Sequence, residues 1–392
     1  MNERGILLAQ IDTLLQQLQS AQETLGANQI HEGCREAAKY RFANLITEAR
    51  NELTAAKENV SDVPDDYDLS GYWQQLSDHK RKCGDLFKES LNFFGGALLR
   101  SIERIDGLCK VADALLLQLS KQAGVEWNRF TILAEGSFFT EATGIIRLPF
   151  PDYSIWNLPV AVHELGHYVG PRIVKSDGTY PFQIKRQQIV ASYTDAAEAE
   201  RQKSFWQEDF SDLFAIYAIG PAYACACLVT AFSPTDGTAC KDGREHPAHA
   251  KRAYLMLEML RGIGQNQYAN LAKHLTDLWK RNLKAAGHTT CLQEADLPQL
   301  DNRVAEIYSI LALAPSVEYK DWTRASELAD GLKANKSVGQ LTKSTDSIAD
   351  VLNAAWLWRI NQANVSDTQL QIIDDKAIAM CRNIMDRPRQ KE

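Results

Sequence analysis

The sequence predicts a mainly α fold of the α+β class, with a small sheet and an N-terminal helical bundle. Two observations support this prediction. Apolar residues recur at helical spacing through most of the 392 residues. Only two short runs, residues 130–133 and 143–148, have the composition of strands, and a turn rich in small residues separates them. A chain of this length can hold two domains, or one domain with a long extension, around a sizeable core.

Residues 1–125 are expected to form a helical bundle or a coiled-coil arm. Helices are predicted at about residues 6–18, 30–60, 70–94 and 98–123, with Gly95-Gly96 ending the third. Long helices with short joins are typical of antiparallel bundles. We interpret the region as a structural bundle packed on the next domain, and the alternative is an arm that recognises a protein partner or substrate.

Residues 126–290 are expected to form a core domain, and residues 291–392 a C-terminal helical region packed on it. After the two strands, helices are predicted at about 158–169, near 183, from about 205 and at 247–264. Amphipathic patterns continue to the end of the chain and are broken by glycines and prolines.

Charge and cysteine content indicate a cytoplasmic protein that does not bind nucleic acid. The net charge is -7, and the densest basic cluster, residues 79–82, is short. The eight cysteines include no CxxC pair, so we interpret them as reduced thiols. The first residues lack the apolar core of a secretory signal.

An uncharged stretch, residues 213–235, is long enough to cross a bilayer. It contains Gly220-Pro221 and is rich in Ala and Cys, which does not favour a membrane span. A buried helix bent at Gly220-Pro221 is predicted instead.

Residues 163–167 read His-Glu-Leu-Gly-His, the pattern of a zinc-binding helix. Histidines at i and i+4 lie on one helix face, so His163 and His167 can reach one metal ion. Glu164 can reach a water held by that metal and take its proton. The flanking residues are apolar or small, so the helix should be buried, and a buried His pair needs a partner. The alternative is a chance match on a solvated helix face.

Zinc in a catalytic site needs a third protein ligand. The metzincin pattern fails because Ile173 occupies the position of its third histidine. Glu208 fits as a ligand, and Asp212, one helical turn further on, could accept the distal N–H of a zinc-bound histidine. The alternative is that both belong to an acidic cluster at a helix N-terminus. Three other acidic residues remain rival ligands: Asp195, Glu198 and Glu200.

These motifs together resemble those of gluzincin peptidases, over about residues 143–255. Within the gluzincins, the CAAX prenyl-protease and HtpX-like peptidases add a His-Pro motif and a later arginine. Here these are His246-Pro247 and Arg252. Arg252 would hold local structure or steady an acidic group. Members of that family are usually membrane-embedded, whereas this chain shows no convincing span, so prenylated or membrane-protein substrates are not expected.

The resemblance implies a zincin-like catalytic domain that binds one Zn²⁺ per chain. His163, His167 and Glu208 would be its ligands. Glu164 would be the general base of peptide hydrolysis. His246 would donate to the oxyanion of the tetrahedral intermediate, where acyl-transfer chemistry requires a donor.

The substrate is expected to be a peptide or protein. The strand at 143–148 would be an exposed edge, so Gly144, Ile145 and Ile146 could pair with an extended peptide through backbone hydrogen bonds. Two alternatives remain. The protein could be a helical scaffold or binding module with a latent or structural zinc site, or it could hydrolyse a non-peptide amide.

Overall fold

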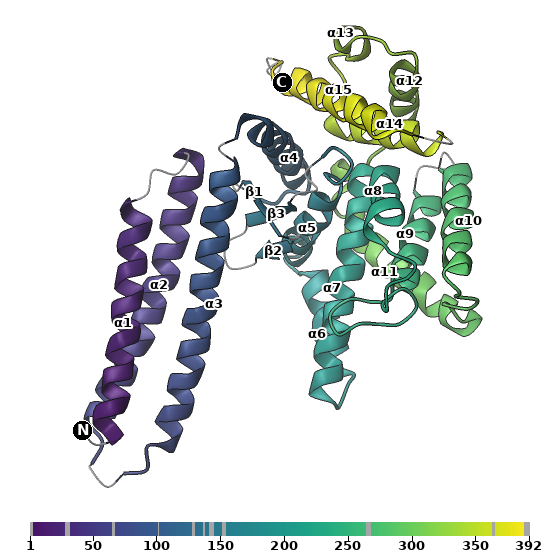
Figure 1. The fold of residues 1–392 in the computed structure, drawn as a ribbon. Helices are drawn as coiled ribbons and strands as arrows, with labels where there is room; N and C mark the ends of the chain where they lie inside the picture. Colours follow the sequence, from purple (N-terminus) through teal and green to yellow (C-terminus); the bar gives the residue numbers. More distant parts are fainter. Residues whose placement is uncertain are drawn as a thin grey trace. The chain divides into compact units, whose positions relative to one another are not determined.

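A computed structural model of the protein describes residues 3–27, 32–64, 67–100, 102–127, 130–135, 138–140, 145–150, 154–263, 268–362 and 365–387. Helices account for 73% of the structure and strands for 3%, which confirms the mainly α fold with a small sheet (Figure 1). The chain divides into two compact units. The first comprises Met1–Glu103, Ile132–Ala134 and Thr140–Ile145, and the second comprises Arg104–Thr131, Glu135–Phe139 and Ile146–Glu392.

Three long helices build the first unit: α1 (Glu3–Ala27), α2 (Glu32–Ser61) and α3 (Ser70–Arg100). They lie side by side, with α2 packed on both α1 and α3 (Figure 1). Their apolar stripes meet in a common interior, where the rings of Phe42 and Phe93 lie 5.3 Å apart.

The prediction that Gly95-Gly96 ends the third helix is wrong, because α3 continues to Arg100. A Cβ atom at Gly96 would lie 2.2 Å from the carbonyl oxygen of Leu133, whereas a Cβ at Gly95 would meet nothing within 4 Å. Gly96 therefore allows the helix to approach a strand backbone closely. The glycine pair reflects packing rather than a helix end.

The small sheet has three strands, β1 (Thr131–Ala134), β2 (Phe138–Thr140) and β3 (Ile145–Pro149), in the order β1-β3-β2. The sequence predicted β1 and β3 but not β2. The expectation that β3 is an exposed edge is therefore wrong, because β2 pairs along its second side. Ile145 and Ile146 are buried, and Gly144 lies outside the described residues.

In the second unit, helix α5 (Val160–Val169) packs against α7 (Ala196–Ile219), and α6 (Pro181–Ala191) packs on α7. The α5–α7 contact depends on two glycines one turn apart. A Cβ at Gly166 would lie 2.8 Å from the Cα of Ser211, and one at Gly170 would lie 2.8 Å from the ring of Phe210. These glycines let the backbones of the two helices approach closely.

The bend predicted at Gly220-Pro221 is confirmed. Gly220 adopts φ +64°, and Pro221 begins α8 (Pro221–Ala226), which is followed by the π-helical turn η2 (Cys227–Ala231). The buried side chain of Asn353 spans the break, donating to the carbonyl of Ile219 at 2.7 Å and accepting from the amide of Ala222 at 2.8 Å. It thus satisfies backbone groups that the interrupted helix leaves unpaired. Within the described residues, every helix is too short or too polar to cross a membrane.

The rest of the second unit is helical. Its remaining helices are α4 (Glu103–Gln122), α9 (His249–Gly262), α10 (Ala269–Ala285), α11 (Leu297–Leu311), α12 (Trp322–Lys333), α13 (Val338–Leu341), α14 (Ile348–Ile360) and α15 (Asp367–Met385). Short 3₁₀ turns occur at η1 (Gly170–Arg172), η3 (Glu294–Asp296) and η4 (Pro315–Val317). Asp374 of α15 accepts a 2.7 Å hydrogen bond from the amide of Ile155, which fixes the segment entering α5.

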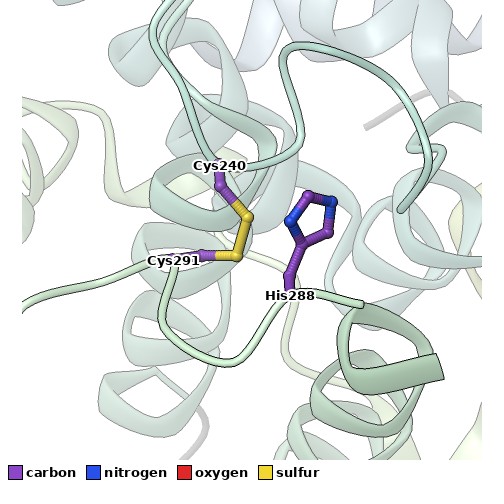
Figure 2. Close-up of side chains that lie close together, drawn as sticks. All are labelled: Cys240, His288 and Cys291. Atoms are coloured by element: carbon purple, nitrogen blue, oxygen red, sulfur yellow. A yellow bond between two sulfur atoms is a disulfide. The ribbon is translucent and has the colours of Figure 1, made fainter. Parts of the chain in front are cut away.

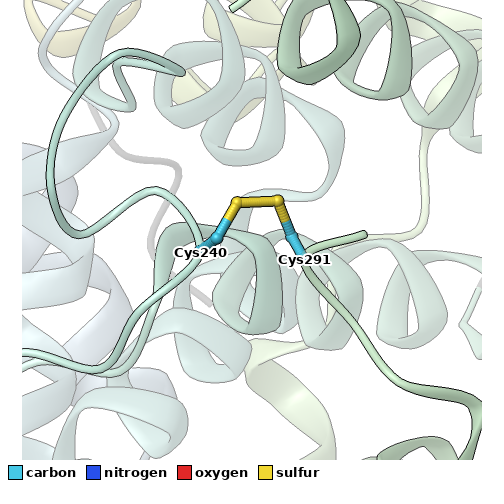
Figure 3. The surroundings of a disulfide bond; sticks show 2 residues. All are labelled: Cys240 and Cys291. Carbon is cyan, nitrogen blue, oxygen red and sulfur yellow. A yellow bond between two sulfur atoms is a disulfide. The ribbon is translucent and has the colours of Figure 1, made fainter. Parts of the chain in front are cut away.

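The interpretation of all eight cysteines as reduced thiols is wrong. Cys240 and Cys291 form a disulfide, with His288 beside it (Figure 2 and Figure 3). The two cysteines are 51 positions apart, so no local sequence motif predicts that they form a disulfide. Five further cysteines are free and buried: Cys83, Cys109, Cys225, Cys227 and Cys381.

The adjacent glycines of α3 provide a matched test of close packing. Gly96→Ala should lower the free energy of unfolding by about 1–3 kcal/mol, because the new methyl group meets a backbone oxygen. Gly95→Ala should raise it by about 0.5–1 kcal/mol, because alanine favours the helix and the space is open. Urea denaturation of both variants measures the difference, and equal effects would contradict the packing of Gly96.

Candidate metal centre

Three side chains from two helices converge at one point of the second unit. His163 and His167 lie one turn apart on α5, and their Nε2 atoms are 3.2 Å apart. Glu208 of α7 faces both rings, with Oε2 3.4 Å from Nε2 of His163 and Oε1 3.3 Å from Nε2 of His167. All three offer a donor atom within 4.8 Å of the others, so one metal ion could contact all three.

The acidic residues that the sequence left as rivals of Glu208 have other partners. Asp195 caps α7 and accepts a 2.9 Å hydrogen bond from the amide of Glu198. Glu198 accepts from Arg201, and Glu200 pairs with Lys203. Because α7 begins at Ala196, Glu208 lies in mid-helix, so the reading of Glu208 as part of an N-terminal acidic cluster is wrong.

Asp212 lies behind His163, one turn beyond Glu208, where the helical spacing predicted it. Its Oδ1 is 2.8 Å from Nδ1 of His163, and its side chain is fully buried. A proton held on Nδ1 leaves Nε2 as the lone-pair nitrogen facing Glu208 and His167. A carboxylate in this position fixes the tautomer and the orientation of a metal-binding histidine.

Two further side chains hold Asp212. Arg252 of α9 donates to both carboxylate oxygens, from Nε and Nη2, each at 2.7 Å. Tyr223 of α8 donates to Oδ1 at 2.5 Å, and its hydroxyl lies 3.0 Å from Nδ1 of His163. Arg252 thus steadies an acidic group, as expected. Sequence reasoning missed Tyr223, although a tyrosine in an uncharged buried stretch needs a partner for its hydroxyl.

The carboxylates make this point attractive to a cation. Burial lowers the pKa of His163, but hydrogen bonds to Asp212 and Glu208 outweigh it and raise the pKa to about 10. Burial raises the pKa of Glu208, but His163, His167 and His246 outweigh it and hold that pKa well below its ordinary value. The negative charges of Asp212 and Glu208 would also stabilise a divalent metal ion beside the imidazoles.

His246 also lies at this centre. Nδ1 of His246 is 3.0 Å from Oε2 of Glu208, and more than half of the His246 side chain is exposed. Its position comes from a tight loop, in which the amide of Gly243 donates to the His246 carbonyl at 2.9 Å. Glu164 follows His163 on α5 and is buried. The structure thus brings both histidines of the motif, Glu208, Asp212, His246 and Arg252 together, as the sequence predicted.

Comparisons with known proteins identify no family for this chain. No family model, no curated protein and no solved structure matches the chain.

The choice of Glu208 over its rivals is tested by metal content. Glu208→Ala should lose most of the metal taken up by the purified chain from Zn²⁺, because two histidines alone bind it weakly. Glu198→Ala and Glu200→Ala, on the same helix, should keep it. Elemental analysis after dialysis makes the measurement, and full retention in Glu208→Ala would contradict this ligand set.

The role of Asp212 is tested with a matched buried pair elsewhere. Asp212→Asn should weaken Zn²⁺ binding by about 10–100-fold, because His163 loses the carboxylate that orients it. Asp346, a buried acceptor from Arg324 at 2.6 and 2.8 Å, serves as the control. Asp346→Asn should lower stability without changing the affinity. Isothermal titration with Zn²⁺ measures the affinity of each variant. Equal affinities in Asp212→Asn and Asp346→Asn would argue against the orienting role of Asp212.

Proposed function

We propose that this protein is a zinc-dependent endopeptidase of the gluzincin type that hydrolyses peptide bonds with Glu164 as general base. The single observation that carries the proposal is the convergence of His163, His167 and Glu208, with Asp212 oriented behind His163. The sequence order and spacing of these residues, with His246-Pro247 and Arg252 after them, support the same family.

The donor set fits zinc. A tetrahedral zinc ion with bonds of about 2.0–2.1 Å separates neighbouring ligand atoms by about 3.3–3.4 Å. The two imidazole Nε2 atoms are 3.2 Å apart, Nε2 of His167 lies 3.3 Å from Oε1 of Glu208, and Nε2 of His163 lies 3.4 Å from Oε2 of the same carboxylate. Oε2 of Glu208 is buried and faces three nitrogen groups, Nδ1 of His246 at 3.0 Å, Nε2 of His163 at 3.4 Å and Nη2 of Arg252 at 3.6 Å, so this carboxylate oxygen already points at the imidazoles that would share a metal ion. Two imidazoles and a carboxylate leave one position for water.

Bound zinc would supply a Lewis acid and lower the pKa of the attacking water. Glu164 takes a proton from that water and returns it to the leaving amine. His246 is close enough to the centre to donate a hydrogen bond where negative charge develops on the scissile carbonyl oxygen. Arg252 and Tyr223 hold Asp212, which keeps the ring of His163 in place during turnover.

A peptide substrate follows from the family resemblance rather than from strand pairing. Because β3 is the middle strand, Ile145 and Ile146 do not lie on a free sheet edge. We therefore do not propose that a substrate peptide pairs with this strand. The exposed side of the centre is formed by His246, whose side chain is 56% exposed, and His167, at 19%. A substrate carbonyl would approach from that side.

The test is cleavage of unfolded casein by the zinc-loaded chain. Glu164→Gln should lower turnover by about 10²–10⁴-fold while keeping its zinc, because the amide cannot accept the proton. Glu200→Gln, an exposed change on α7, is the matched control and should cleave like the unmodified protein.

If neither the unmodified protein nor Glu164→Gln cleaves casein while both hold zinc, the peptidase proposal is overturned. That outcome would favour a helical scaffold whose zinc is structural, with the helices α1–α3 as the surface for a protein partner.

A further inference from the structure

A second cluster of metal-binding side chains lies on other elements of the same unit. It consists of Cys240, His288 and Cys291, whose donor atoms all lie within 4.8 Å of one another. The cysteines are joined as a disulfide, and the imidazole of His288 lies beside the two sulfur atoms (Figure 2). Two thiolates and an imidazole are a donor set that zinc prefers.

We propose that, when Cys240 and Cys291 are reduced, this cluster binds a second Zn²⁺ through their two thiolates and His288, and that disulfide formation releases it. This site shares no residue with the centre at His163, His167 and Glu208. It does not rest on peptidase activity.

The backbone on both sides of the cluster is held by bonds other than the disulfide. Before α9, the carbonyls of Thr238 and Ala239 accept 3.0 Å hydrogen bonds from the amides of His249 and Ala250. After α10, Gly287 adopts φ +89°, and the amide of His288 donates to the carbonyl of Leu283 at 2.9 Å. Helices α9 and α10 pack on each other. These contacts should keep the three donors close after reduction.

His288 distinguishes this cluster from a purely structural disulfide. A disulfide needs no imidazole at its side, whereas a zinc site with two thiolates needs at least one more ligand. The ring is half-buried and accepts or donates no hydrogen bond among the described residues. It is therefore available to a metal ion.

Solvent and reductant can reach the cluster. His288 and Cys291 line a cavity of about 530 Å³ between α9 and α10, whose wall also includes Trp279 and Lys284. Cys240, His288 and Cys291 are each half-buried rather than enclosed. A metal site needs such an entry path.

The two states are linked by a balanced exchange. A small disulfide oxidant takes two electrons from the two zinc-bound thiolates, and its own S–S bond breaks to give two thiolates. The sulfur atoms of Cys240 and Cys291 form the new S–S bond, and Zn²⁺ leaves unchanged in charge. A dithiol or phosphine reductant reverses the sequence.

The experiment uses Co²⁺ as a spectroscopic probe in the full chain, oxidised or reduced with a phosphine. Thiolate ligands give sulfur-to-cobalt charge-transfer absorption in the near ultraviolet, which the centre of two histidines and a glutamate cannot give. We expect this absorption, and one more metal ion per chain, only in the reduced protein. Zn²⁺ should displace the cobalt, and oxidised glutathione should release the zinc to a chromogenic chelator.

Matched variants assign the ligands. Cys291→Ser should abolish the charge-transfer absorption, and His288→Ala should weaken Co²⁺ binding by about tenfold or more. Cys83→Ser, a buried thiol outside the cluster, and His274→Ala, an exposed histidine of α10, should change neither. Absence of the absorption from reduced protein, with equal metal content in both redox states, would overturn the proposal and leave a structural disulfide. Unchanged affinity in His288→Ala would overturn the three-ligand set.

Discussion

The second unit is organised around the buried carboxylate of Asp212. Four hydrogen-bonding groups reach its two oxygens, one from His163, one from Tyr223 and two from Arg252. Removing a carboxylate from water is strongly unfavourable unless charge and hydrogen bonds compensate. Burial therefore raises the pKa of Asp212, and Arg252 outweighs it and holds that pKa low. This one carboxylate joins α5, α7, α8 and α9. Loss of any partner would leave its buried negative charge less well compensated in the apolar interior.

The geometry of that ion depends on close backbone packing. Gly166 brings α5 within contact of Ser211, the residue before Asp212, so His163 and His167 lie opposite Glu208. The break at Gly220 turns the chain back, so that Tyr223 returns to Asp212. Asn353 stabilises this break by bonding both severed backbone groups. The C-terminal helices thus contribute to the candidate metal centre without providing a ligand.

The loop before α9 connects the two clusters of metal-binding residues. His246 lies six positions after Cys240 in this loop. At one end the disulfide ties the loop to the segment after α10, and at the other His246 contacts Glu208. Asp242 accepts hydrogen bonds from the amide of Ala248 and from Nζ of Lys251, and these bonds hold the loop against the start of α9. The position of His246 therefore depends on a segment that covalent and polar links restrain at several points.

The sequence by itself determined the helical class, the helix bearing His163 and His167, and the bend at Gly220-Pro221. It did so because periodicity, i to i+4 spacing and the limits on glycine and proline are local properties. It also placed Asp212 one turn after Glu208, since helical spacing alone puts both on one face.

Only the tertiary structure decided what depends on chain segments far apart. It selected Glu208 among four acidic residues, because the others have partners that sequence cannot show. It placed β2 beside β3, joined Cys240 to Cys291 across 51 positions, and showed that Gly96 serves packing rather than a helix end. Each of these outcomes is set by which surfaces meet when the core is buried, and no local pattern in the chain encodes that.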